Sequence, residues 1–179
     1  MASGVRKAGR LPGWLAGVVL AAACAVQPAW GQEPGPGPSG SRLRAADPKA
    51  AALLATGAAR SATFKAIVDM IERSDLITYV ETRPLTRPGQ LQFLVASPVC
   101  RHVRVSVRVP GLVTDQIAWL AHELWHAVEI AGAPDVSDQA SLQRFYGRIG
   151  DGGRYSGSVE SGKAQQTWTK VLDELRTAR

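Results

Sequence analysis

The sequence predicts an α+β fold in which a small antiparallel sheet of about three strands packs against several helices. Three runs of residues have strand character, over 76–82, 91–97 and 102–109. The turns between these runs are short, which favours antiparallel pairing of successive strands. Apolar residues recur at helical spacing both before and after the three runs. One domain with one core is therefore expected.

The first 31 residues have the three-part pattern of a secretory signal peptide. Basic residues open the segment, an apolar run from Trp14 to Val26 follows, and small residues at 29 and 31 precede Gln32. The apolar run is shorter than the roughly 20 residues that a transmembrane helix needs. We expect cleavage before Gln32 and a secreted or periplasmic protein. In an alternative interpretation, residues 20–24 loosely resemble a bacterial lipoprotein box, and lipidation of Cys24 would attach the protein to a membrane.

Charge and cysteine content argue against a nucleic-acid-binding protein and against a domain stabilised by disulfides. Removal of residues 1–31 takes away three of the 21 basic residues and none of the 15 acidic ones, so the net charge becomes 18 minus 15, or +3. The remaining basic residues are scattered and have no interleaved aromatic residues, which argues against a nucleic-acid-binding surface. Cleavage also leaves Cys100 without a second cysteine, so no internal disulfide is expected and Cys100 is interpreted as a small buried thiol.

Residues 32–46 are predicted to form a disordered linker, because proline and glycine alternate through much of this range. The folded domain is accordingly expected over 47–179. Asp47 and Pro48 are typical of an N-cap followed by the first helical position, and they predict a helix to about Thr56. Ser61 is expected to cap a second helix, whose apolar face contains Phe64, Ile67, Val68 and Ile71.

The third strand-like run alternates most regularly. Its apolar face carries Val103, Val105, Val107 and Val109, and its polar face carries His102, Arg104, Ser106 and Arg108. His102 is therefore assigned to a solvated face of the sheet and not to a metal site.

The most informative segment is the predicted helix over 114–131, which contains His122-Glu123-Leu124-Trp125-His126. Its apolar face is predicted to be Ile117, Ala121, Leu124, Val128 and Ala131. Residues four apart lie one turn above each other on a helix, so the two imidazoles project side by side and can hold one metal ion. Glu123 then lies beside the ion, where its carboxylate can accept a proton from water.

These five residues resemble the active-site helix of the zincin metallopeptidases, a family in which a sheet precedes the H-E-x-x-H helix. The resemblance implies a zinc-dependent hydrolase acting on peptide bonds. It implies that His122 and His126 bind zinc and that Glu123 is the general base. It also implies that an edge strand of the sheet pairs with an extended peptide or protein substrate.

The branches of the zincin family differ in the third zinc ligand. Metzincins would have glycine at 129 and histidine at 132, whereas this chain has Glu129 and Gly132. Gluzincins supply a glutamate from a later helix. Glu160, on the inward stripe of a helix predicted over 158–176, fits that role, because a buried carboxylate needs a cation or hydrogen-bonding partner. Glu129 is the alternative, but three ligands on one helix would spread over about 10 Å, which favours a role beside His126 instead.

The rest of the chain adds packing elements and one further candidate group. Gly132 and Pro134 predict the end of the H-E-x-x-H helix, and a following helical segment carries Leu142, Phe145, Tyr146 and Ile149. The phenols of Tyr146 and Tyr155 are candidates to stabilise an oxyanion, or they cover the core. Together with the signal-peptide pattern, the resemblance to the zincins implies a small secreted zinc metallopeptidase. The alternative is a non-catalytic secreted module that keeps the fold and possibly a structural metal.

Overall fold

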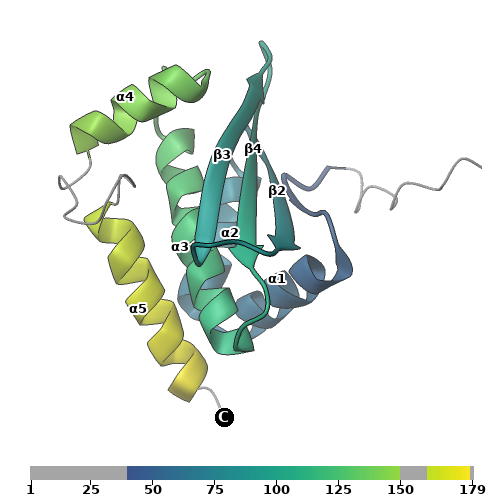
Figure 1. Ribbon diagram of the computed structural model, residues 1–179. Coiled ribbons are helices and arrows are strands. Elements are labelled where there is room, and N and C mark those ends of the chain that lie inside the picture. Colours follow the sequence, from purple (N-terminus) through teal and green to yellow (C-terminus); the bar gives the residue numbers. More distant parts are fainter. Residues whose placement is uncertain (1–39, 150–160, 178–179) are drawn as a thin grey trace, which may run out of the picture. The chain divides into compact units, whose positions relative to one another are not determined.

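Four strands form one mixed sheet, and five helices accompany it, in the residues that the computed structural model describes, 40–149 and 161–177. All of these residues belong to the unit Glu33–Arg179. The elements in chain order are β1 (Leu43–Ala45), α1 (Pro48–Arg60), α2 (Ala62–Glu72), β2 (Leu76–Arg83), β3 (Gly89–Ala96), β4 (Arg101–Arg108), α3 (Val113–Ala131), α4 (Gln139–Ile149) and α5 (Gly162–Thr177) (Figure 1). The α+β class predicted from the sequence is confirmed.

The sheet is mixed, so the prediction of a purely antiparallel sheet is wrong. The strand order is β1-β2-β4-β3. β1 pairs with β2 and β2 pairs with β4 in parallel, and β3 and β4 alone are antiparallel. The physical reason lies in residues 84–88, which reverse the chain as expected but reach across two strand spacings of about 4.8 Å each. β4 then occupies the position between β2 and β3 (Figure 1).

The ordered domain begins before Asp47, which corrects the predicted linker over 32–46. Within that range β1 adds a parallel strand to the sheet, with Leu43 opposite Thr78. The carboxylate of Glu72 accepts hydrogen bonds from Ser41 Oγ at 2.7 Å and from the backbone N–H of Arg42 at 2.8 Å. Hydrogen bonds to this carboxylate hold the start of the domain against α2. Residues 1–39, including the predicted signal peptide and Cys24, lie outside the described residues.

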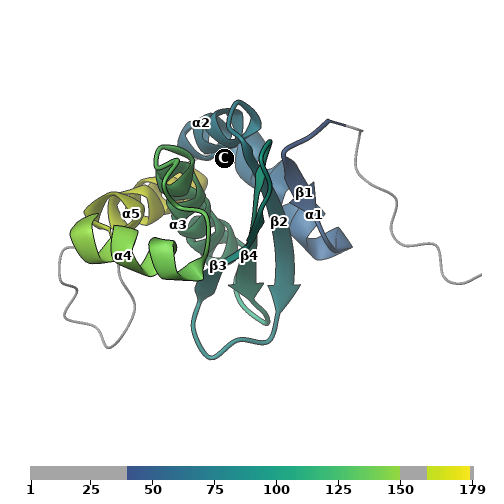
Figure 2. The ribbon, with the colours of Figure 1, turned by 90° about the horizontal axis from the view of Figure 1, so that it is seen from above.

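Helices α1, α2 and α3 lie against one face of the sheet, and α5 packs on α3, farther from the sheet (Figure 2). On β4, Val103, Val105 and Val107 are buried on this face, whereas His102 and Arg104 on the other face are partly exposed. The largest fully buried side chains come from α2, β2, β4, α3 and α5: Phe64, Ile67, Ile71, Leu76, Ile117, Leu120, Leu124, Ile130, Leu175, His122, Val80 and Val103. A histidine therefore lies among the core residues. No described helix is long and apolar enough to cross a bilayer.

Arg101 fastens the C-terminal end of α3 to the sheet. Its guanidinium is buried and forms two hydrogen bonds with the Asp75 carboxylate, at 2.6 and 2.7 Å. The same guanidinium donates to four backbone carbonyls at and after the end of the helix, those of Ile130, Ala131, Ala133 and Val136. The hydrogen bond and the charge of Arg101 lower the pKa of Asp75 below its usual range, against a smaller opposing effect of burial.

Candidate metal and catalytic site

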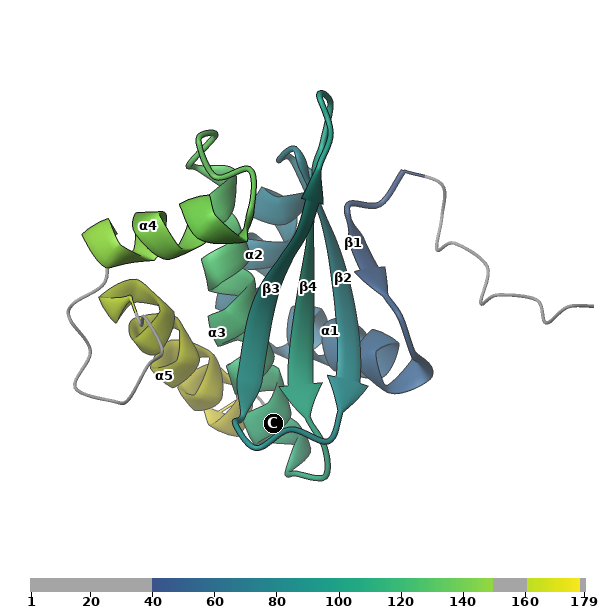
Figure 3. The same ribbon diagram turned by 45° about the horizontal axis from the view of Figure 1, so that its top comes forward.

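Helix α3 carries the H-E-x-x-H residues into the interior of the domain. The exposed fractions of His122, Glu123 and His126 are 1%, 7% and 6%. α3 lies between the sheet and α5, which runs alongside it, and α4 crosses near its C-terminal end (Figure 3). The predicted apolar face is buried at Ile117, Ala121 and Leu124, whereas Val128 and Ala131 are only partly buried. Thus the apolar face and the polar stripe of this helix are both covered.

The two histidines of the motif are neighbours, as the helical spacing predicts. Their ring centroids are 4.9 Å apart, and the rings are nearly perpendicular. His126 also contacts Tyr146 of α4, edge to face at 5.2 Å, and the His122 ring lies 5.2 Å from that of Trp119. Trp119 in turn contacts Trp168 of α5 at 5.5 Å, so aromatic groups line this part of the boundary between α3 and α5.

Glu129 fixes the orientation of His126. Its Oε2 is 2.9 Å from His126 Nδ1. A carboxylate can only accept, so Nδ1 carries the proton in this contact, and Nε2 is the ring nitrogen through which a neutral His126 would bind a metal ion. Carboxylates that hold metal-binding histidines in this way are common around metal sites. The side chain of Glu129 is thus placed as a partner of His126, which is one of the two roles that the sequence left open for it.

Glu129 also connects three helices. Its Oε1 accepts from Ser161 Oγ, just before α5, at 2.5 Å and from Trp125 Nε1 at 3.0 Å. Tyr146 of α4 donates a longer hydrogen bond, 3.4 Å, to Oε2. Burial raises the pKa of Glu129, but the hydrogen bonds from His126, Ser161 and Trp125 and the charge of His126 lower it by more, so the net shift is downward. Glu129 is therefore a carboxylate at neutral pH.

Glu160, the predicted third ligand, lies outside the described residues. Ser161, the next residue in the chain, is described, and its Oγ reaches the carboxylate that holds His126. The predicted start of the last helix at 158 likewise falls on residues that are not described, and the described helix begins at Gly162.

Glu123 is packed against the backbone of β3. A Cβ atom added to Gly89, the first residue of that strand, would lie 2.6 Å from Oε1 and 2.7 Å from Cγ of Glu123. Real Cβ atoms do not make such contacts, so only glycine fits at this position without moving the carboxylate or the strand. The sequence analysis missed this contact, because glycine after proline at 88–89 indicates only a turn.

The described donor set fits the first two positions of a zinc site. Two neutral imidazoles are common zinc ligands, and zinc also accepts carboxylate oxygen. Within residues 40–149 and 161–177, no cluster of three or more His, Cys, Asp or Glu residues is arranged to hold a metal ion.

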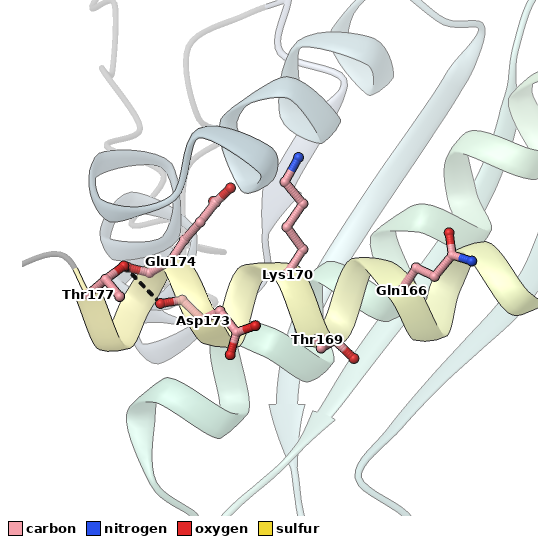
Figure 4. A pocket seen from close by; sticks show the side chains of 6 residues that line it. All are labelled: Gln166, Thr169, Lys170, Asp173, Glu174 and Thr177. Atoms are coloured by element: carbon pink, nitrogen blue, oxygen red, sulfur yellow. Dashed lines mark hydrogen bonds between the residues drawn. The ribbon is translucent and has the colours of Figure 1, made fainter.

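Two other features of the structure lie apart from this cluster. His102 is on the opposite face of β4, where it stacks on Tyr79 and its Nε2 is 3.3 Å from Cys100 Sγ. The partly exposed Cys100 is thus less buried than predicted. An open hollow of about 450 Å³ runs along α5 and is lined by Gln166, Thr169, Lys170, Asp173, Glu174 and Thr177 (Figure 4). It contains neither the histidines nor Glu123, so we do not assign it to the same site.

Comparison of the chain with protein-family models, with curated proteins and with solved structures gives no match.

Proposed function

We propose that this protein is a zinc-dependent metallopeptidase, as the resemblance of its H-E-x-x-H helix to that of the zincins implies. The observation that supports this proposal most strongly is the geometry around His126. Its imidazole is held through Nδ1 by the partly buried carboxylate of Glu129, while the ring of His122 lies 4.9 Å away. A carboxylate that orients a buried histidine is expected where that histidine binds a metal through its other nitrogen.

Each residue of the cluster has a role in this proposal. His122 and His126 bind zinc, and Glu160 is the proposed third ligand. Bound zinc would polarise the peptide carbonyl and activate a water molecule for attack. Glu123 would act as the general base, which takes a proton from the attacking water and gives it to the leaving amine. Glu129 keeps His126 in the tautomer that can bind the metal.

The position of β3 supports a peptide as the substrate. In the described part of the sheet β3 is an edge strand, paired on one side with β4. Gly89 of the same strand touches Glu123. An extended peptide that added to this edge through main-chain hydrogen bonds would lie beside the proposed base.

The second candidate is a non-catalytic module that keeps the fold, with or without a structural metal. The deep burial of the cluster favours it, because 7% is the largest exposed fraction among His122, Glu123 and His126. Structural zinc sites are closed, whereas catalytic sites keep one position open. Zinc binding with hydrolysis of a protein substrate supports the first candidate, and zinc binding without hydrolysis supports the second.

Replacement of either histidine by alanine should abolish zinc binding, because each removal leaves too few ligands. We expect Glu160→Ala to weaken binding far more than Glu129→Ala, for which the loss should be about 10- to 100-fold, as for other partners of ligand histidines. The measurement is zinc stoichiometry after dialysis, followed by competition titration with a chelator. A wild-type protein that retains no zinc would refute the metallopeptidase, and a larger loss in Glu129→Ala than in Glu160→Ala would refute the ligand assignment.

Export is part of the proposal, since residues 1–31 are expected to be a signal peptide. The exported protein should then begin at Gln32, and intact-mass measurement of the secreted or periplasmic fraction checks this. A lipid-modified species that begins at Cys24 would show instead that the protein is membrane-anchored.

A further inference from the structure

We infer that Gly89 is a positioning residue for Glu123. Because glycine has no side chain, Glu123 can pack directly against the backbone of β3. This inference rests on the proposed function, in which Glu123 is the base. A Cβ at position 89 would lie 2.6, 2.7 and 3.0 Å from Oε1, Cγ and Cδ of Glu123. Contacts under 3.0 Å force something to move. Since one of these atoms is Cγ, rotation of the carboxylate alone would not relieve the overlap.

The requirement for glycine is steric and not conformational. Gly89 lies within β3, where it is opposite Val107 of β4, and it is buried. The glycine with a positive φ among the described residues is Gly40. An alanine could therefore adopt the backbone conformation at 89, and the Glu123 side chain is what excludes it.

The neighbouring structure makes displacement of Glu123 the expected response. β3 is held by its ladder with β4, in which Gly89, Gln90 and Leu91 are in register with Val107, Ser106 and Val105. α3 is fastened at its C-terminal end by Arg101. A side chain can change its rotamer at less cost than a paired strand can move. Thus the backbone of β3 at Gly89 limits where the Glu123 side chain can lie.

The expected effect of Gly89→Ala is a fall in kcat at unchanged zinc content. A misplacement of about 1 Å in a reacting group can cost 100-fold in rate, so we expect a decrease of roughly 10- to 100-fold. KM should change little, because the residue is not proposed to contact substrate through a side chain. Two variants serve as controls. Gly147→Ala introduces a methyl group with no atom within 4 Å, and Gly57→Ala introduces one 2.9 Å from the core residue Phe64.

The experiment measures kcat and KM on fluorescently labelled casein, at equal zinc occupancy, for the wild type and the three variants. Gly147→Ala should stay within twofold of the wild type, and Gly57→Ala should lose thermal stability but keep kcat in its folded fraction. In a Glu123→Gln background, Gly89→Ala should cause no further loss. An unchanged kcat in Gly89→Ala, or an equal loss in the Glu123→Gln background, would overturn the inference.

A second measurement does not depend on activity and separates this inference from the proposed function. The ¹³C resonance of the Glu123 side-chain carboxyl can be assigned by its absence in Glu123→Gln. We expect Gly89→Ala to shift this resonance and Gly147→Ala to leave it in place. If the wild type proves inactive, the proposed function fails, but a shifted resonance still supports the positioning of Glu123 by Gly89. A resonance that does not move refutes it.

Discussion

Glu123→Gln is expected to lower the rate of casein hydrolysis by about 10²- to 10⁴-fold, the typical contribution of a general base. Glutamine has the size of glutamate and fits the same space beside Gly89, but it cannot accept the proton from water. His122, His126 and Glu129 are unchanged by the substitution, so zinc stoichiometry and thermal stability should match the wild type. The measurement compares initial rates of the two proteins at equal zinc occupancy.

A matched control is Glu81→Gln. Glu81 lies on β2. Its carboxylate accepts a hydrogen bond from Ser106 and forms an ion pair with Arg83, and neither partner belongs to α3. Its substitution should leave the rate within about twofold of the wild type, and a zinc chelator should abolish the activity of both proteins. A Glu123→Gln rate close to that of the wild type would refute the role of Glu123 as base.

The local structure of this chain was predictable where side-chain periodicity is strong. The helix with the H-E-x-x-H residues was predicted over 114–131 and runs over 113–131. The strand with alternating valines was predicted over 102–109 and runs over 101–108. In both segments a single spacing of apolar residues separates a buried face from a polar one, so the element follows from residues close in sequence.

The arrangement of the strands was not predictable from the same signals. Strand character and turn residues indicate direction reversals, and β2 and β3 do run in opposite directions. They do not indicate whether residues 84–88 leave space for another strand. The three residues of β1 are too few to show alternation, and its place in the sheet depends on the distant Glu72 carboxylate.

The candidate site divides in the same way. The neighbourhood of His122, His126 and Glu129 follows from their spacing on one helix. By contrast, Gly89 and Ser161 reach α3 from elements that are 34 and 32 residues away from Glu123 and Glu129 in the chain. A glycine and a serine carry no sequence signal for such contacts, so the tertiary fold alone reveals them.

Arg101→Met is expected to lower the free energy of unfolding by about 3 kcal/mol, because buried backbone carbonyls lose their donor at a cost of roughly 1–3 kcal/mol each, whereas the Asp75 side chain is 44% exposed and its ion pair adds less. Methionine retains much of the aliphatic volume but none of the donors. The carbonyls of Ile130, Ala133 and Val136 would lose their hydrogen bonds from the guanidinium. Since buried acceptors without partners are costly, most of the effect should come from these backbone groups.

The matched control is Arg104→Met on the same strand. Arg104 lies on the opposite face of the sheet, its side chain is 38% exposed, and its nitrogen is 3.9 Å from Glu81. Exposed ion pairs contribute about 0–1 kcal/mol, so this variant should stay close to the wild type. Chemical denaturation at pH 7 measures both. An equal loss in the free energy of unfolding of the two variants would contradict the proposal that Arg101 holds the C-terminal end of α3 against the sheet.

The pH dependence of stability gives an independent test of the Arg101 contacts. Because Arg101 lowers the pKa of Asp75 in the folded state, the ion pair stabilises the protein above the unfolded pKa of about 3.9. That stabilisation is lost as pH falls through the lower folded pKa. The difference between wild type and Arg101→Met should thus be largest near neutral pH and should shrink in acid, leaving the part due to the backbone carbonyls. A difference that does not change with pH would mean that Asp75 contributes nothing, and that the carbonyls at the end of α3 account for the whole effect.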